Sequence, residues 1–134
     1  MERRKLLIAS AETTVSEAAR RMADKQVGAL LVVEDKRLVG IFTERDALFR
    51  VIAKGLEPGK TRLADVMTRD PKTISPDKTF GLAMLVMNEN RFRHLPVIEN
   101  GRLVGIVSAR DALDPDLEEF VAEERRRKQF AARR

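Results

Sequence analysis

Hydrophobic positions in the first half of the chain follow helical spacing, then strand spacing, then helical spacing again. Between residues 13 and 25 apolar residues recur every three or four positions, which is typical of an amphipathic helix. Residues 28–42, GALLVVEDKRLVGIF, hold two β-rich runs around a polar turn and predict a hairpin. Residues 43–55 predict a second helix that begins at Thr43 as its N-cap and ends just before Gly55.

The same order returns 65 residues later. RLVGIFTERDAL at 37–48 and RLVGIVSARDAL at 102–113 share nine of twelve residues. The second copy predicts a helix, then a hairpin over 94–107 with an Asn-Gly turn, then a second helix that starts at SARDAL. Such a repeat indicates two structural units that bury a common core. The predicted apolar face of the first helix in this copy consists of Phe80, Ala83, Met84 and Met87.

We predict an α+β fold in which two β-α-β-β-α units, related by a pseudo-twofold axis, pack sheet to sheet. Neither unit is expected to bury its sheet face alone, because each has only about 45 residues. A short helical turn is expected at RLADVM, between the units, and Asp114-Pro115 predicts the start of a further helix. The predicted boundaries are 7–55 for unit one, 56–72 for a linker, 73–114 for unit two and 115–134 for a basic C-terminal helix.

The composition excludes several kinds of chemistry. The chain has no Cys, which excludes disulfides, thiolate metal sites and cysteine nucleophiles. His94 is the only His, so a two-histidine metal site is excluded as well. There is no Walker-type loop and no nucleophile elbow around a serine. Apolar runs such as GALLVV are too short to span a bilayer, so no membrane-spanning segment is expected. The absence of Cys fits a cytoplasmic location.

The positive charge lies at the ends of the chain. The net charge is +5, but residues 123–134 contribute +4 and residues 2–5 contribute +2, so the remaining body carries −1. A basic tail of this kind is either a solvated helix end or a binding site for a polyanion such as nucleic acid.

The junction between the hairpin and the following helix carries the strongest chemical signal. It has the sequence GIFTERD at 40–46 and GIVSARD at 105–111, so a hydroxyl residue begins each helix and an Asp follows three positions later. One interpretation is a capping box that only closes the helix start. The other is a ligand site, because helix-start N–H groups attract phosphate and an ionised Asp accepts hydrogen bonds from a ribose diol.

Two further residue types favour the ligand interpretation. Arg45 and Arg110 lie in the first helical turn, within reach of a bound anion. Gly40 and Gly105 lack a side chain, so another group can approach the backbone there. Because the whole arrangement occurs twice, a ligand site is favoured over capping alone. Capping stays open, since duplication preserves structure as well as function.

Several stretches resemble the CBS (cystathionine β-synthase) domain family, and the two copies together resemble a CBS pair, or Bateman module. The resemblance extends from about Leu7 to Leu113. The matching stretches are TTVSEAARRM, GALLVV, RLVGIFTERD, DVMTRDPKTISPD, RHLPV and RLVGIVSARD. The family's motif of glycine, hydrophobic, any residue, Ser or Thr, two of any residue and Asp corresponds to Gly40, Thr43 and Asp46, and to Gly105, Ser108 and Asp111.

The resemblance implies a non-catalytic regulatory module that binds AMP, ADP, ATP or NAD in the cleft between the two copies; S-adenosylmethionine is another ligand of the family. In the family the Asp holds the ribose hydroxyls, the hydroxyl and basic groups meet phosphate, and residues near the short strand and the HLPV turn enclose the base. The ligand-binding residues implied here are Thr43, Arg45, Asp46, Thr73, Ile74, Arg93, His94, Pro96, Ser108, Arg110 and Asp111. The counterparts of the base-enclosing residues in unit one are Ile8, Ala9, Gly28, Ala29 and Leu31.

The two motifs are not equivalent. Gly28-Ala29 in unit one replaces Arg93-His94 in unit two, and Glu44 places a negative charge near any phosphate where unit two has Ala109. We therefore predict that the second motif binds more tightly.

Three functions remain to be compared. The first is a nucleotide sensor that forms a homodimer and acts through an effector protein on another chain. The second is a nucleic-acid-binding protein that uses residues 123–134, although Phe130 is the only aromatic residue there to stack on bases. The third is an enzyme, for which no acid, base or nucleophile can be assembled.

Overall fold

The computed structural model describes residues 6–109 and divides the chain into two compact units, one ending at Pro71 and the other beginning at Lys72. Both units combine helices with a β-sheet, which confirms the predicted α+β class. The second helix predicted for unit two and the predicted C-terminal helix both lie outside the described residues. None of the helices between residues 6 and 109 has the length and apolar character needed to cross a membrane.

The first unit contains a four-stranded sheet in the order β1-β2-β3-β4. Strand β1 runs parallel to β2, and the other neighbours are antiparallel. Strands β2 and β3 form the predicted hairpin, and both turn residues, Asp35 and Lys36, have positive φ, at 49° and 67°, as a type I′ turn requires. The strands are β1 (Ile8–Ala9), β2 (Ala29–Glu34), β3 (Arg37–Thr43) and β4 (Thr68–Arg69).

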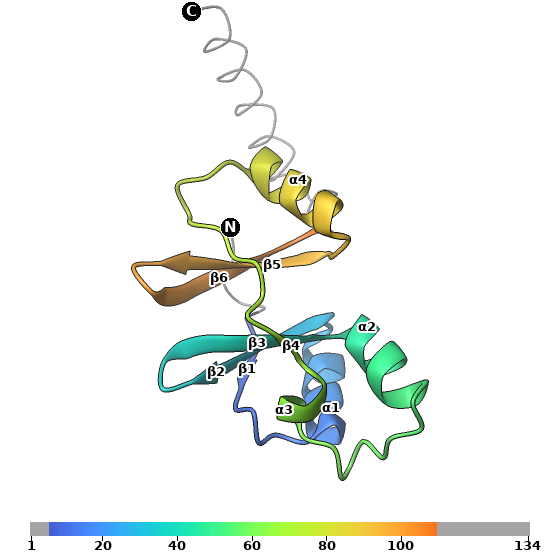
Figure 1. Cartoon of the computed structure of the whole chain (residues 1–134). Helices are drawn as coiled ribbons and strands as arrows, with labels where there is room; N and C mark the ends of the chain where they lie inside the picture. The colour runs from blue at the N-terminus through green and yellow to red at the C-terminus, as the bar shows by residue number, and fades with distance from the viewer. Residues whose placement is uncertain (1–5, 110–134) are drawn as a thin grey trace, which may run out of the picture. The chain divides into compact units, whose positions relative to one another are not determined.

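The helices of the first unit pack on one face of this sheet (Figure 1). Thr14 is the N-cap of the first helix, and its hydroxyl accepts a hydrogen bond from the Glu17 N–H at 3.2 Å. The helix predicted over 43–55 is present as a short α-helical turn followed by a π-helical turn, and Gly55 follows its end at φ 70°. These elements are α1 (Val15–Lys25), α2 (Glu44–Asp46), η1 (Ala47–Ile52) and α3 (Leu63–Val66).

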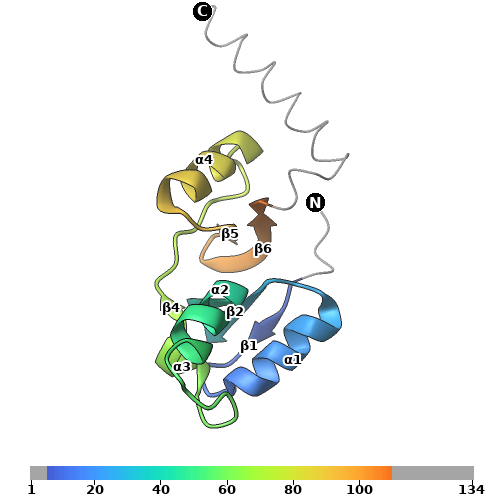
Figure 2. The ribbon, with the colours of Figure 1, turned by 90° about the vertical axis from the view of Figure 1, so that its right-hand side faces the viewer.

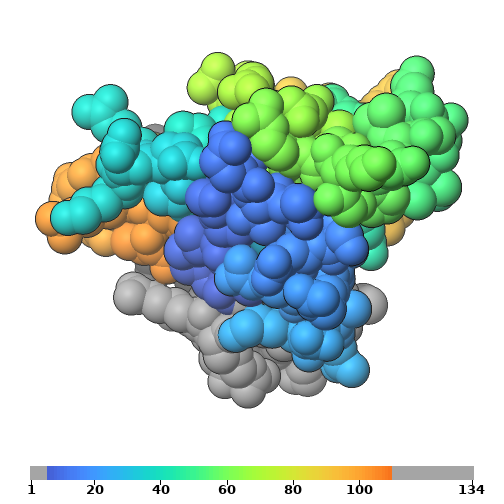
Figure 3. Space-filling model, turned by 90° about the horizontal axis from the view of Figure 1, so that it is seen from below, coloured from blue at the N-terminus to red at the C-terminus, as the bar shows by residue number. Residues whose placement is uncertain are grey.

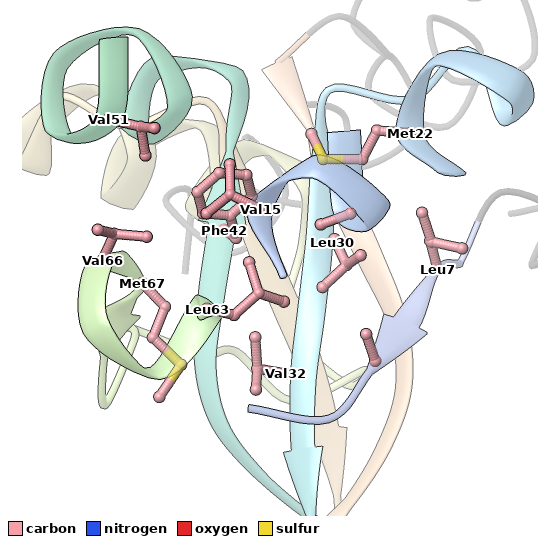
Figure 4. Close-up of a cluster of buried hydrophobic side chains, with 12 residues drawn as sticks. Leu7, Val15, Met22, Leu30, Val32, Phe42, Val51, Leu63, Val66 and Met67 are labelled. Atoms are coloured by element: carbon pink, nitrogen blue, oxygen red, sulfur yellow. The ribbon is translucent and has the colours of Figure 1, made fainter. Parts of the chain in front are cut away.

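One hydrophobic core joins β1, β2, β3, α1, η1 and α3 (Figure 4). Phe42 of β3 and Val51 of η1 are fully buried in it, together with Leu63 of α3. Burial of side chains of this size contributes about 1.5 to 3 kcal/mol each. The remaining core residues are Leu7, Ala9, Val15, Ala18, Met22, Leu30, Val32, Val66 and Met67.

The stretch predicted as a linker contributes α3 and β4 to the first unit. The Val15 N–H donates to the Thr61 carbonyl at 2.8 Å, and the Leu63 N–H donates to the Thr13 carbonyl at 2.8 Å. This stretch therefore lies against the start of α1 (Figure 3). Strand β4 then pairs with Gly40 and Ile41 of β3.

An exposed ion cluster reinforces this contact. The Arg62 guanidinium lies 3.2 Å from an Asp65 carboxylate oxygen and 3.1 Å from a Glu12 carboxylate oxygen. The hydrogen bond with Asp65, and then that with Glu12, raises the pKa of Arg62 above its ordinary value. The same bond with Arg62 lowers the pKa of Asp65. The cluster joins residues 50 positions apart, so it holds the linker to the loop before α1.

The second unit repeats the helix and hairpin of the first, with α4 (Phe80–Asn90), β5 (His94–Glu99) and β6 (Arg102–Ser108). The predicted Asn-Gly turn is confirmed, since Asn100 and Gly101 have φ of 52° and 79°. Helix α4 packs on the hairpin (Figure 2), and its predicted apolar face is confirmed. The buried core residues of this unit are Phe80, Ala83, Met87, Leu95, Val97 and Val107, and Met84 is partly buried against them.

Candidate functional site

The first motif forms a reciprocal capping box at the start of α2. The Thr43 hydroxyl accepts a hydrogen bond from the Asp46 N–H at 3.2 Å. In return, Asp46 Oδ2 accepts one from the Thr43 N–H at 3.0 Å. The structure thus brings Thr43 and Asp46 together as predicted and shows that capping is a real role of this pair.

Asp46 has further partners in its own unit. Its Oδ2 also accepts a hydrogen bond from the Thr43 hydroxyl at 3.2 Å, while its Oδ1 accepts one from the Thr68 hydroxyl at 3.4 Å and lies 3.5 Å from Arg50 Nε. Only 7% of Asp46 is exposed. An ionised carboxylate offers about four acceptor positions, and four donors surround this one. Asp46 therefore ties the helix start to β4.

Arg50 and Thr68 are contacts of the motif that sequence reasoning missed. The Arg50 guanidinium also donates to the carbonyls of Val66 and Met67, at 3.4 and 3.3 Å. Its spacing of four residues from Asp46 is a helical ion-pair signal that the sequence does contain. Thr68 gives no such signal, because it is 22 residues from Asp46 along the chain.

Gly40 is approached by the chain itself. A Cβ at this position would lie 2.5 Å from Met67 Sδ and 3.0 Å from the Thr68 carbonyl oxygen. The sequence predicted a close approach here and associated it with a ligand, whereas the structure fills the space with the linker. At Gly105, a Cβ would meet no described atom within 4 Å.

Arg45 extends from the first turn of α2 and is exposed. Its guanidinium carbon lies 5.7 Å from the centre of the Phe49 ring, within the range of a cation–π contact. This contact joins consecutive turns of one helix face, so it orients the guanidinium along the helix surface.

In both units a backbone hydrogen bond joins the residue just after the second strand of the hairpin to the residue just before its first strand. In the first unit the Glu44 N–H donates to the Gly28 carbonyl at 3.0 Å, and in the second the Ala109 N–H donates to the Arg93 carbonyl at 2.8 Å. In unit two this bond brings Ser108, at the end of β6, close to Arg93 and the start of β5. These groups were predicted to meet a ligand together.

Ile74 and Pro96 are also brought together in the second unit. The Ile74 N–H donates to the Pro96 carbonyl at 3.0 Å, and the Ile98 N–H donates to the Ile74 carbonyl at 2.8 Å. Pro96 is fully buried and has no N–H, so it cannot make the bond that its counterpart Leu31 donates to the Leu7 carbonyl at 2.8 Å. Proline therefore limits the short strand of unit two to a single parallel bridge.

The remaining predicted residues are placed as follows. Thr73 is exposed beside Ile74, and His94 is half-buried at the start of β5. Arg110 and Asp111 lie outside the described residues. Ligand binding by any of the predicted residues stays a prediction. Among residues 6–109, no group of three or more His, Cys, Asp or Glu is placed to hold a metal ion.

Comparison with known proteins identifies similar sequences. The CBS domain family model matches residues 1–53 and 63–117. A CBS domain-containing protein of Arabidopsis thaliana, CBSCBSPB3, is 43% identical over 96 residues, which are 71% of this chain and 17% of that protein. The mitochondrial CBSX3 of the same plant is 39% identical over 107 residues, 76% of this chain and 52% of that protein. The chain thus spans no more than about half the length of these relatives.

Several solved structures match over most of their own length. A protein assigned to signal transduction, with CBS domains, from Burkholderia ambifaria MC40-6 has a TM-score of 0.80 and 33% identity, covering 86% of this chain and 85% of that chain. The CBS domain protein PAE2072 of Pyrobaculum aerophilum, solved with AMP, has a TM-score of 0.79 and 25% identity, covering 92% and 95%. A hexameric CBS-CP12 protein from bloom-forming cyanobacteria has a TM-score of 0.78 and 26% identity, covering 97% and 76%.

Proposed function

Because the chain belongs to the CBS domain family, we propose that it is a regulatory module that binds an adenine nucleotide, AMP, ADP, ATP or NAD, without transforming it. The observation that carries this proposal is the AMP complex of a structural neighbour that covers 92% of this chain. It is supported by the repeated junction, in which the residue after the hydroxyl residue donates a backbone hydrogen bond to the residue that precedes the first strand of the hairpin.

We place the stronger nucleotide site at the second motif. In the first motif, four donors of the same unit already surround the Asp46 carboxylate, so a ribose would have to displace one of them. Arg50 supplies one of these donors from four positions after Asp46. The residue four positions after Asp111 is Pro115, which offers no cation. The sequence around Asp111 thus lacks the cation that Arg50 supplies to Asp46, and we expect an acceptor position to remain for a ribose diol.

The other groups of this site would bind different parts of the nucleotide. Ser108 and Arg110 would bind phosphate, since a hydroxyl and a guanidinium both donate hydrogen bonds to an anion. Ile74 and Pro96 would pack on the base as apolar walls, with Thr73, Arg93 and His94 at its edge. Arg45 would serve phosphate at the weaker first motif.

A module of this kind acts through a partner. We propose that it forms a homodimer and passes its signal to an effector on another chain. The hexameric CBS-CP12 neighbour shows that related chains assemble with one another. A ligand shifts such an assembly only by its differential affinity for two states, so the nucleotide is expected to change the association constant or the partner affinity.

Calorimetric titration with AMP, ATP and NAD tests the proposal. We expect one of these to bind, and a nucleotide at 100 times its Kd to stabilise the chain by about 2.7 kcal/mol. Asp111→Ala should weaken nucleotide binding at least tenfold. Asp46→Ala should weaken it less, and its main effect should be a lower free energy of unfolding. Absence of heat and of thermal stabilisation with all three compounds would reject the nucleotide function. A larger loss of affinity from Asp46→Ala would reject the assignment to the second motif.

A further inference from the structure

Arg50 contacts two sets of acceptors within the first unit. Its Nε lies 3.5 Å from Asp46 Oδ1, and its guanidinium also donates to the carbonyls of Val66 and Met67. The two partners of the ion pair differ in exposure, since the side chain of Arg50 is 51% exposed and that of Asp46 only 9%. Arg50 therefore reaches from the solvent side onto a carboxylate that its own unit otherwise encloses.

The two oxygens of the Asp46 carboxylate are engaged differently. Oδ2 accepts hydrogen bonds from the Thr43 N–H and hydroxyl, at 3.0 and 3.2 Å, and so closes the helix start. Oδ1 accepts from the Thr68 hydroxyl at 3.4 Å and faces Arg50 Nε at 3.5 Å. The contacts of Oδ1 are the longer ones and hence the weaker ones. A ligand can therefore gain an acceptor position on Oδ1 without breaking the cap.

Of the two donors on Oδ1, Arg50 is the easier one to displace. Thr68 is half-buried and belongs to the paired strand β4, whereas Arg50 has a long, half-exposed side chain. An ion pair with this much exposure contributes little to stability. A guanidinium N–H and a ribose hydroxyl are both donors to a carboxylate oxygen, so they compete for the same position.

We propose that Arg50 is an internal competitor of the nucleotide at the first motif. It occupies the acceptor position of Asp46 that a ribose hydroxyl would take, an inference that rests on the proposed function. Pro115, which has no donor group in its side chain, stands at the equivalent position after Asp111. Arg50 is thus a positioning residue that acts through Asp46 and lowers the affinity of the first motif relative to the second.

Calorimetric titration with AMP tests this competition in the Asp111→Ala background, in which the second motif is weakened. The test variant adds Arg50→Met, which keeps a long side chain of good helix propensity and removes its donors. We expect it to bind AMP at least fivefold more tightly than Asp111→Ala alone. The matched control adds Lys54→Met instead, which removes an exposed cation four residues later, and should change the affinity less than twofold.

Two further titrations separate competition from a structural effect. The compound 2′,3′-dideoxy-AMP lacks both ribose hydroxyls, so Arg50→Met should not tighten its binding. Arg50→Lys restores a cation that can pair with Asp46 and should bring the AMP affinity back to within twofold of the background. Circular dichroism verifies folding of each variant. Arg50→Ala, in which the same gain is expected, replaces Arg50→Met if that variant does not fold.

Several outcomes overturn the proposal. Equal AMP affinity with and without Arg50, or an equal gain with 2′,3′-dideoxy-AMP, would mean that Arg50 does not compete with the ribose. Weaker AMP binding by Arg50→Met would mean that Arg50 itself holds the nucleotide. These results differ from a failure of the proposed function, in which the unmodified chain binds none of AMP, ATP and NAD.

Discussion

The two units share a hairpin and a helix, but their glycines at equivalent positions have different surroundings. Gly40 lies directly under Met67 and Thr68, whereas Gly105 faces no described atom within 4 Å of a Cβ. In the first unit the linker adds β4 beside this glycine and ties it to Asp46 through Thr68. The repeated stretch thus packs against the linker at Gly40 in unit one, whereas in unit two no described atom lies close to a Cβ at Gly105.

The helices that precede the hairpins, α1 and α4, also differ, because polar residues on the outer side of α1 are replaced by apolar residues in α4. Glu17, Arg20 and Arg21 of α1 correspond, 65 residues later, to apolar residues of α4. Helix α1 therefore has one apolar face and one polar face, while α4 is apolar almost all round until Asn88. These α4 residues are Leu82, Leu85 and Val86. Helix α4 thus has the same pattern of core residues as α1, but apolar residues occupy positions that are charged in α1.

Gly40→Ala and Gly105→Ala provide the sharpest contrast between the units. The Gly40 change should lower the free energy of unfolding by about 1 to 3 kcal/mol, because Met67 is buried and the Thr68 carbonyl belongs to a paired strand. The Gly105 change should stay within about 0.5 kcal/mol. Urea unfolding of both variants measures the difference, and equal losses would show that the position in unit two is also closely packed.

Asp46→Ala should lower the free energy of unfolding by about 1 to 2 kcal/mol, because it removes a reciprocal cap and leaves the Thr68 hydroxyl without this acceptor. Thermal unfolding followed by circular dichroism measures the loss. Glu44→Ala, an exposed acidic residue of the same turn, is the matched control and should have a smaller effect. A result with the two reversed would contradict the role of Asp46 in tying α2 to β4.

Leu85→Arg recreates in α4 the residue found at Arg20 of α1. Because Leu85 is 51% exposed, the free energy of unfolding should change by no more than about 0.5 kcal/mol. Met87→Ala, at a buried position of the same helix, should cost about 2 to 5 kcal/mol. Chemical denaturation of both variants tests this. A large loss from Leu85→Arg would mean that the outer side of α4 is covered in solution.

The smallest expected effect is the pH dependence of the ion cluster at the linker. Asp65 has a lowered pKa when folded, so its pairing with Arg62 stabilises the fold above the ordinary pKa of Asp and is lost as the pH falls through the lowered value. The Tm of the unmodified chain should exceed that of Asp65→Asn slightly at neutral pH, and the gap should close in acid. Asp24→Asn, which removes an exposed carboxylate of α1 outside the ion cluster, is the matched control. A gap for Asp65→Asn that does not change with pH would exclude the charge as its cause.

Local features of the fold could be predicted from the sequence because their causes are local. Asn100-Gly101 favours positive φ, Thr43 can cap a helix, and Phe80, Ala83 and Met87 share one helix face. The docking of the linker could not be predicted, since it depends on contacts such as Leu63 with Thr13 that are far apart in sequence.

The same limit applies to the candidate site. The sequence predicted that Thr43 and Asp46 meet, but the number of donors around Asp46 depends on Thr68, which arrives from another element. It also predicted a close approach to the backbone at Gly40, and in the structure the group that approaches is the linker. Composition and spacing indicate which groups can bind, whereas tertiary packing decides which of them are already engaged.

Thr68 gives the first motif a mechanical link to the rest of the chain. It belongs to β4, three residues before Pro71, where the first unit ends. A molecule that competes for the oxygen now shared by Thr68 and Arg50 would loosen the last strand of this sheet together with the exit of the chain. Binding of a molecule at Asp46 would then increase the mobility of the segment that connects the two repeats.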